Sequence, residues 1–333
     1  MVETTKDTNE AKKPAAAIHV APAPHLSSGS TSRRMMIDVL IALVPVAAVS
    51  LWIFQWYALK QIIVCVAGCV VAEAVFTAMR RRPIALGDCS AVVTGLILAF
   101  SMPGTAPWWV GAIGSAVAIG LGKVVFGGIG QNIFNPAMVG RAFVMVAFTK
   151  FLGAGGYVDI HAAADAITQA TPMTAAFKAG EGFDLLKLLT GQTNGSLGET
   201  SAIACLLGGL YLCIRRTASW QIPAGAILGL LAAAGIDNLA HPAASWTALH
   251  HLFGGAFMLG AFFICTDPVT SPLTSKGKFI FGLIFGLLVM LIRLFTNYPE
   301  GVMFSVLLVN AITPLLNRWT VRKPLGWVAE ARK

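Results

Sequence analysis

The chain has 333 residues, of which 56% are hydrophobic and only 12% are charged, and its formal net charge is +9. A soluble globular domain carries about 25% charged residues, so this composition excludes an ordinary soluble domain and predicts an all-α polytopic membrane protein. Lys and Arg form short clusters between apolar runs, as cytoplasmic anchors do, so the positive charge does not indicate a nucleic-acid partner.

The N-terminal segment differs in composition from the rest of the chain. Residues 1–31 are polar and rich in Ala, Pro, Ser and Thr, and they show no signal-peptide pattern. Such a segment cannot bury enough apolar surface to fold alone. We expect residues 1–31 to be a disordered cytoplasmic arm.

Ten apolar segments follow, and a helix needs about 20 apolar residues to cross a bilayer. The third and the eighth segments are short, and we expect them to be broken or re-entrant, which is tolerated where the backbone is buried in protein. The ten segments are residues 35–55, 58–79, 88–102, 107–126, 136–153, 199–214, 221–239, 250–265, 278–295 and 301–317.

The distribution of basic residues predicts the orientation of these segments, because cytoplasmic loops carry an excess of Lys and Arg. Basic clusters precede the first segment and follow the second, sixth, eighth and tenth, whereas the fourth is marked only by Lys123 near its end. Both termini are therefore expected in the cytoplasm. The clusters are Arg33 and Arg34, Arg80 to Arg82, Arg215 and Arg216, Lys276 and Lys278, and Arg318, Arg322 and Lys323.

This orientation divides the chain into two halves of five segments each. Residues 32–153 and 199–317 form the halves, residues 154–198 form an exterior loop between them, and residues 318–333 form a cytoplasmic tail. Because each half has an odd number of segments, the halves have opposite orientation, which permits the inverted repeats used by many transporters.

Several kinds of site are absent from the sequence. The Gly-Lys pairs at 122–123 and 277–278 are not followed by Ser or Thr, so there is no phosphate-binding P-loop. The six cysteines lie in or beside apolar runs without metal-ligand spacing, which favours a packing role. An iron–sulfur cluster shared with another subunit remains open as an alternative.

Charged residues within apolar segments are costly and often functional. We interpret Asp38, Glu199 and Arg293 as anchors at the membrane interface. Glu73 lies deeper in its segment, and Asp88 and Asp267 lie at the limits of broken segments. These last three are candidates for an ion pathway, with an ordinary structural role about equally well supported.

The stretch 127-GGIGQNIFNPAMVG-140 combines glycines with the amides of Gln131, Asn132 and Asn135. Pro136 is expected at the first position of a helix, where its missing N–H is harmless. A helix start can hold an anionic or polar ligand group. Spacing alone favours the simpler interpretation of a cytoplasmic loop followed by an ordinary helix start.

Thr171 precedes Pro172 in the predicted exterior loop, so its backbone is biased toward extended conformations that project the side chain. The hydroxyl could be esterified by a phosphate. From the residues alone, an exposed Thr-Pro turn without function is the better interpretation.

Taken together, six motifs resemble one family, which contains the D subunits of Rnf electron-transport complexes and the B subunits of sodium-translocating NADH:quinone reductases. They follow one another in the family's order and cover nearly everything after the N-terminal arm. The motifs are 87-GDCSAVVTGLILAFSMP-103, 107-PWW-109, 127-GGIGQNIFNPAMVG-140, 165-DAITQATPM-173, 260-GAFFICTDPVTSP-272 and 298-YPEGVMFSVLLVNAITPLL-316.

The resemblance implies a cofactor and its attachment residue. In this family a Thr in an [ST]-x-A-T segment carries FMN through a phosphoester bond, and the matching residue here is Thr171, at the end of 168-TQAT-171. A non-covalent riboflavin is also associated with the family. Gln169 stands where the reductase branch usually has Gly, which favours the Rnf branch.

The resemblance also implies an architecture and partners. The fold would be about ten transmembrane helices in two inverted five-helix repeats, similar to urea transporters, in a prokaryotic plasma membrane. The partners would be other Rnf subunits, including an outward-facing FMN subunit and iron–sulfur subunits, and an exported flavin transferase. The complex would couple electron transfer between ferredoxin and NAD to ion translocation. The alternatives are a B-type reductase subunit, a flavin-free solute channel or transporter, and a purely structural membrane subunit.

Overall fold

Helices occupy every one of the ten apolar segments in the computed structural model, which describes residues 31–82, 86–152, 177, 182–191, 195–199, 201–242, 245–296 and 301–321. Residues 32–333 form one unit. Five helices are long and apolar enough to cross a membrane: α1 (Ser32–Phe54), α2 (Trp56–Met79), α9 (Gln221–Ala240), α12 (Ser275–Phe295) and α13 (Val302–Thr320). The chain is thus an all-α, multi-pass membrane protein.

The remaining segments contain shorter helices. Within the described residues these are η1 (Leu86–Asp88), α3 (Ser90–Phe100), α4 (Trp108–Ile119) continued by the π-turn η2 (Gly120–Val124), α5 (Pro136–Ala147), α6 (Thr149–Leu152), α7 (Leu185–Thr190), α8 (Ala202–Ile214), α10 (Ala248–Phe253), and α11 (Phe257–Leu259) continued by the π-turn η5 (Gly260–Ile264). The sequence did not predict α7, which lies in the interval 154–198.

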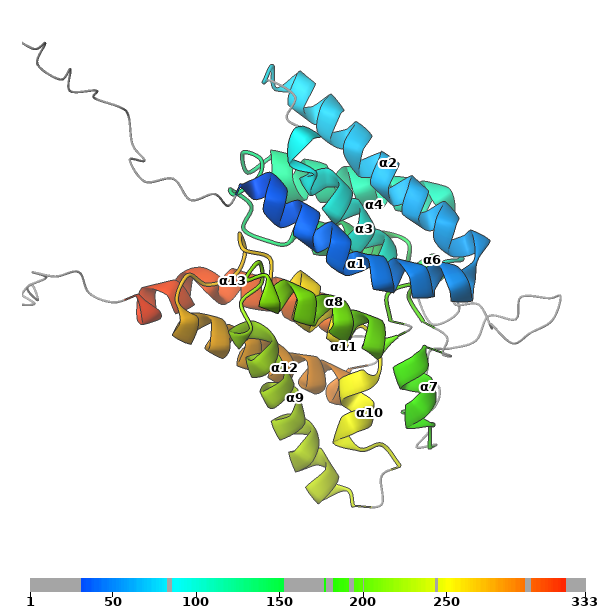
Figure 1. Cartoon of the computed structure of the whole chain (residues 1–333), viewed down its shortest axis with the longest axis vertical. Helices are drawn as coiled ribbons and strands as arrows, with labels where there is room; N and C mark the ends of the chain where they lie inside the picture. The colour runs from blue at the N-terminus through cyan, green and yellow to red at the C-terminus, as the bar shows by residue number, and fades with distance from the viewer. Residues whose placement is uncertain are drawn as a thin grey trace, which may run out of the picture. The chain divides into compact units, whose positions relative to one another are not determined.

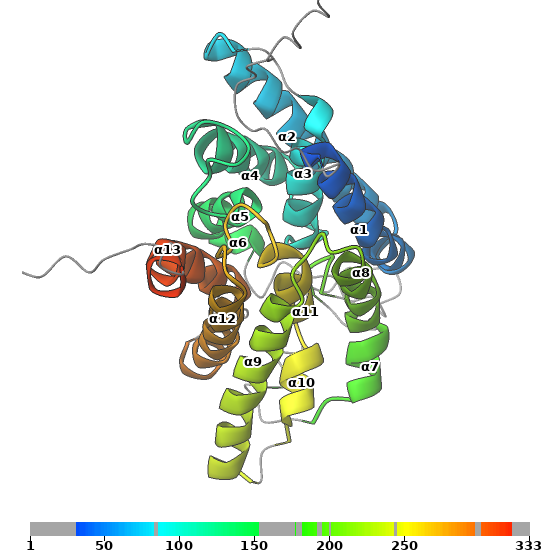
Figure 2. The ribbon, with the colours of Figure 1, turned by 60° about the vertical axis from the view of Figure 1, so that its left-hand side comes forward.

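Helices α1 to α5 lie together, and helices α8 to α13 form a second group (Figures 1 and 2). Within the first group α2 packs on α3 and α4, and α4 packs on α5; within the second, α9 packs on α12 and α12 on α13. The two groups meet where α1 packs on α8 and where α5 packs on α13.

Glycines bring α9 and α12 into backbone contact. A Cβ atom added at Gly286 would lie 2.1 Å from the Ala226 carbonyl oxygen, and one added at Gly229 would lie 2.3 Å from the Leu283 oxygen. Helices in lipid associate through such close packing of small residues. This pair therefore forms the tightest helix contact of the second group.

Helix α3 ends inside the protein. It has 11 residues, about 16 Å at 1.5 Å per residue, so it covers only about half of a bilayer core. Its last carbonyls are satisfied because Gly198 N–H donates to Phe100 O (2.7 Å) and Leu197 N–H donates to Met102 O (3.1 Å). Residues 195–199, at the end of the predicted exterior loop, are buried here.

The eighth segment is broken between α10 and α11, as its short length predicted. Gly255 adopts a φ of 69°, which favours glycine. The Arg293 guanidinium donates to the carbonyls of His251 (2.5 Å) and Gly254 (2.8 Å), so the freed end of α10 is satisfied. Arg293 is 2% exposed, which corrects its interpretation as an interface anchor.

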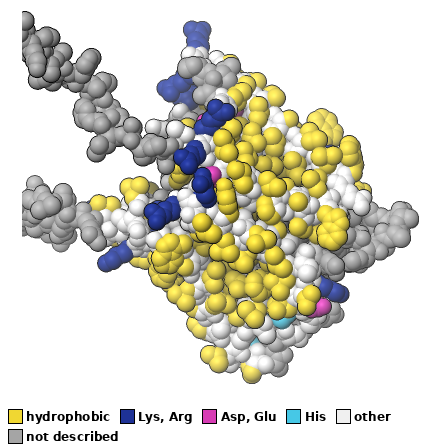
Figure 3. Space-filling view, viewed as in Figure 1, with side chains coloured by type: hydrophobic (Ala, Val, Ile, Leu, Met, Phe, Trp, Pro, Cys, Tyr) yellow, Lys and Arg dark blue, Asp and Glu magenta, His cyan; other side chains and the backbone are white. Residues whose placement is uncertain are grey.

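Hydrophobic side chains cover the centre of the face shown in Figure 3, and Lys and Arg side chains gather along its left edge. Exposed basic residues include Arg33, Arg34, Arg80, Arg81, Arg82, Arg215, Arg216 and Lys276. Lys123 does not belong with them, because it is 3% exposed. It is therefore not an exposed anchor of the fourth segment.

Candidate functional site

The start of α5 organises the contact between the two groups of helices. The Asn135 side chain caps the helix by accepting from Ala137 N–H (3.1 Å) and Met138 N–H (3.4 Å), and Pro136 occupies the first position, as predicted. Asn135 also donates through its N–H to Asn310 Oδ1 (3.1 Å) and through its amide to Ile264 O (3.3 Å). Asn135 thus ties α5 to α13 through its backbone N–H and to the end of η5 through its side chain.

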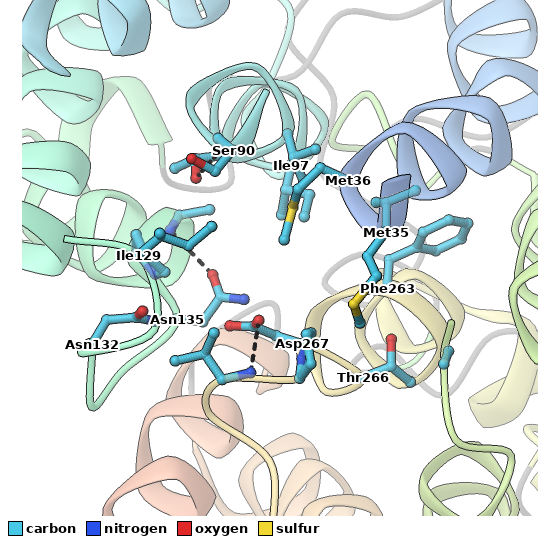
Figure 4. A pocket seen from close by; sticks show the side chains of 18 of the residues that line it. Met35, Met36, Ser90, Ile97, Ile129, Asn132, Asn135, Phe263, Thr266 and Asp267 are labelled. Carbon is cyan, nitrogen blue, oxygen red and sulfur yellow. Dashed lines mark hydrogen bonds between the residues drawn. The ribbon is translucent and has the colours of Figure 1, made fainter. Parts of the chain in front are cut away.

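A pocket opens beside this helix start (Figure 4). Its free space is about 770 Å³, the open mouth included. Its walls are mostly apolar, with polar groups at a few places. Lining residues include Met35, Met36, Ile97, Phe263, Asn132, Asn135, Ser90, Lys123 and Asp267. We call it the amide pocket, after Asn132 and Asn135.

One wall of the amide pocket holds a buried ionic network. The Lys123 ammonium contacts Glu73 Oε1 and Ser90 Oγ, both at 2.5 Å. The Asp88 carboxylate accepts from the Ser90 hydroxyl (2.8 Å) and the Ser90 N–H (3.0 Å). The structure therefore brings the predicted Glu73 and Asp88 together, through Lys123 and Ser90.

The same network borders a second pocket, of about 690 Å³ with its open side included. Glu73 and Asp88 line it together with Arg80, Arg82 and the glycines at 127–128. Lys123 lines the amide pocket, so the Glu73–Lys123 pair lies between the two pockets. The buried Glu73 Oε2 has no hydrogen-bonding partner among the described residues.

Asp267 lies apart from that network, across the amide pocket from Ser90 (Figure 4). Its carboxylate accepts from Val269 N–H (3.2 Å) and from the Thr270 hydroxyl (3.2 Å), which closes a local turn after η5. The Thr270 carbonyl in turn accepts from the Thr313 hydroxyl (3.0 Å) of α13. Asp267 is thus positioned by the broken segment.

Asp38 and Glu199 are not anchors either, because both are buried. The Asp38 carboxylate accepts from the Thr217 hydroxyl (2.9 Å) and pairs with Arg215 (3.4 Å), so it joins the start of α1 to the end of α8. Glu199 accepts from the Ser196 hydroxyl. These acids hold chain segments together through contacts inside the protein.

Thr171, the predicted attachment residue, lies outside the described residues. Phe177, a little further along the chain, is described. Its ring packs edge-on against His251 (4.8 Å between centroids) and beside Trp246 (5.4 Å). Phe177 is therefore packed against α10.

The sequence did not single out two polar residues of this region, Lys123 and Asn310. The position of Lys123 did not reveal its role, because a charge at the end of an apolar run can either face a headgroup or turn inward. Asn310 interrupts the apolar run 301–317, and this isolated polar residue was the available signal.

No group of His, Cys, Asp and Glu within the described ranges could hold a metal ion, and the described cysteines are all free thiols.

Comparison with known proteins decides the family. The model of the NQR2, RnfD, RnfE family matches residues 19–326. The chain belongs to this family.

Three relatives illustrate the match. The D subunit of the Na(+)-translocating ferredoxin:NAD(+) oxidoreductase complex of Acetobacterium woodii is 40% identical over 315 residues, covering 92% of this chain and 95% of the relative. The D subunit of the ion-translocating oxidoreductase complex of Stutzerimonas stutzeri is 38% identical (91% and 94% covered). The corresponding protein of Halorhodospira halophila is also 38% identical (89% and 92% covered). Membership in the family thus extends across the chain.

We expect Glu73→Gln to destabilise the protein by about 3–5 kcal/mol, because it leaves the Lys123 ammonium buried without its countercharge. Adding Lys123→Met to Glu73→Gln should recover most of this loss, since neither charge then remains. Thermal unfolding in detergent measures both effects, and Lys187→Met at an exposed position serves as the control. A Glu73→Gln variant as stable as the wild type would contradict the pairing.

Proposed function

We propose that the chain is the membrane subunit of an ion-translocating oxidoreductase complex of the Rnf type, in which it carries covalently bound FMN and passes electrons. The observation that carries this proposal is the match to D subunits over about nine-tenths of both chains. The names of these relatives describe ion translocation and, for one, ferredoxin:NAD(+) oxidoreduction. The complex containing this chain would couple the same electron transfer to ion movement.

The attachment residue is proposed to be Thr171. It ends the segment 168-TQAT-171, which fits the family's acceptor pattern, and Pro172 favours an extended backbone that projects the hydroxyl. An exterior position suits modification by an exported flavin transferase and electron exchange with an outward-facing partner subunit. When bound, the isoalloxazine ring supplies chemistry in steps of one or two electrons, and the protein contributes its tethering.

The amide pocket is the proposed site of a second, non-covalent flavin. Its mostly apolar walls with a few polar groups are the pattern typical of small-molecule sites. Asn132 Nδ2 donates to Phe134 O (3.1 Å), while its Oδ1 accepts no hydrogen bond from the described residues. That oxygen is available to an N–H donor such as the pyrimidine edge of riboflavin.

Two inverted repeats are proposed for the membrane region, with both termini cytoplasmic and the membrane that of a prokaryotic cell. Residues 95-GLILAFSMPGTAP-107 and 260-GAFFICTDPVTSP-272 align without a gap, and both end in P-x-T-[AS]-P. The same register pairs the first residues of α2 and α9. Contacts between the groups join α1 to α8 and α5 to α13, which are counterparts, as a two-fold axis would place them.

An ion pathway past Glu73, Asp88 and Asp267 is also proposed. Each carboxylate lines one of two pockets that the Lys123–Glu73 pair separates. Acids at such positions in the membrane are commonly part of ion routes.

Thr171→Ala should abolish covalent flavin. The wild type, coexpressed with its flavin transferase and denatured on a gel, should fluoresce and carry one FMN on the peptide containing Thr171. Thr168→Ser, which keeps the acceptor pattern, and Thr174→Ala, which lies outside it, are matched controls that should remain fluorescent. A dark wild-type band would favour a flavin-free transporter over this proposal, whereas label on Thr168 or Thr174 would refute only the residue assignment.

Asn132→Leu should remove the non-covalent flavin and leave the covalent FMN in place, because it deletes the acceptor in the amide pocket. Acid extraction followed by chromatography separates released riboflavin from protein-bound FMN. Asn132→Asp keeps an oxygen acceptor and should retain much of the riboflavin. Full riboflavin content in Asn132→Leu would place that flavin elsewhere.

Asp88→Asn and Asp267→Asn should reduce ion uptake several-fold while electron transfer continues, because each removes a charge from the proposed route. Sodium and proton uptake by proteoliposomes containing the complex, measured beside its redox activity, provide the test. Glu73→Gln with Lys123→Met examines the third acid without leaving an unpaired ammonium. A variant with normal coupled uptake would exclude its residue from the pathway.

A further inference from the structure

Arg141 differs from the other buried cations of the described region. It lies on α5 and is 6% exposed. Lys123 has Glu73 as a countercharge, and Arg293 donates to backbone carbonyls. Arg141 Nη1 has no hydrogen-bonding partner, and its guanidinium pairs with no carboxylate, among the residues that the structure describes. An uncompensated buried charge is costly, so this one indicates a missing negative partner.

The guanidinium lines a cavity between the two groups of helices. Met138 and Arg141 contribute from α5, Met303 from the start of α13, and Ile264 from the end of η5. The free space is about 410 Å³ with its open side included. Most of it is too narrow for a solvent-sized species, which leaves room for about one.

The remaining lining offers little to a polar ligand. Most of it is apolar side chain, including Met145, Leu259 and Val302. The Ser101 hydroxyl already donates to Leu98 O (2.7 Å). The Arg141 guanidinium is therefore the dominant polar feature of this cavity.

The register of the proposed repeats places an apolar residue at the position equivalent to Arg141. It pairs Met138 with Met303, which both line the cavity, and it pairs Arg141 with Val306. Val306 is fully buried. Because an apolar side chain suffices at the equivalent position of the second half, helix packing does not by itself require a charge at Arg141.

We propose that Arg141 and this cavity bind one small monovalent inorganic anion of the size of chloride. A single charge matches a single guanidinium. Weakly hydrated halides tolerate apolar walls, whereas sulfate or phosphate would need further donors and more room. The bound anion would cancel a positive charge that otherwise repels cations from the space between the two groups of helices.

The test is the halide dependence of stability, measured on the purified complex. A ligand that binds only the folded state raises the melting temperature with its concentration. We expect the wild type to melt at higher temperature in sodium chloride or sodium bromide than in sodium gluconate of equal ionic strength. Arg141→Gln should lose this difference, and Arg141→Lys should keep part of it. Arg318→Gln removes an exposed arginine and should keep all of it.

A second measurement keeps the proposal testable if Arg141→Gln does not fold. Bound chloride broadens the ³⁵Cl resonance, and bromide locates the site by anomalous diffraction at Arg141 in the wild type. No halide response in the wild type, an unchanged response in Arg141→Gln, or a neighbouring subunit's carboxylate seated on Arg141 would each overturn the proposal. Thr171→Ala should leave the halide response intact, so the result is independent of the covalent flavin.

Discussion

Backbone polar groups inside a membrane need partners from the protein, and the architecture around the site depends on how two broken segments meet this requirement. The end of α3 is satisfied by the N–H groups of Leu197 and Gly198. The end of α10 is satisfied by Arg293. With no water in the lipid core, such ends are tolerated only where protein covers them, so both breaks lie against other segments.

The functional features gather at these breaks. Asn135 connects the start of α5 to the end of η5, and Asp267 closes the turn that follows. The amide pocket lies beside them because the helices there are interrupted, which leaves space and polar groups that continuous helices would not provide. Lys123 and Glu73 add a neutral ion pair to its wall. The pocket is thus a consequence of irregular backbone as much as of particular side chains.

The sequence predicted the apolar segments, the start of α5 at Pro136 and the break in the short eighth segment, because these follow from local hydropathy and backbone preference. Its motifs also indicated the family. It could not predict that Lys123, Asp38, Glu199 and Arg293 turn inward. A charge near the end of an apolar run has the same sequence pattern whether it faces a lipid headgroup or a buried partner. The partner lies far away in the chain, so the local sequence does not reveal it. The pairing of Lys123 with Glu73 is one such long-range contact.

The glycine contact between α9 and α12 has a consequence for movement. Backbones that touch through Gly229 and Gly286 leave no layer of side chains that could rearrange, so these two helices travel as one body. Gly208 locks α8 to α1 in the same way, since a Cβ atom added there would lie 2.1 Å from the Ala42 carbonyl oxygen. Relative displacement of the two groups would then fall where α5 meets α13. The Asn135–Asn310 hydrogen bond lies at that contact, so breaking it would loosen α5 from α13.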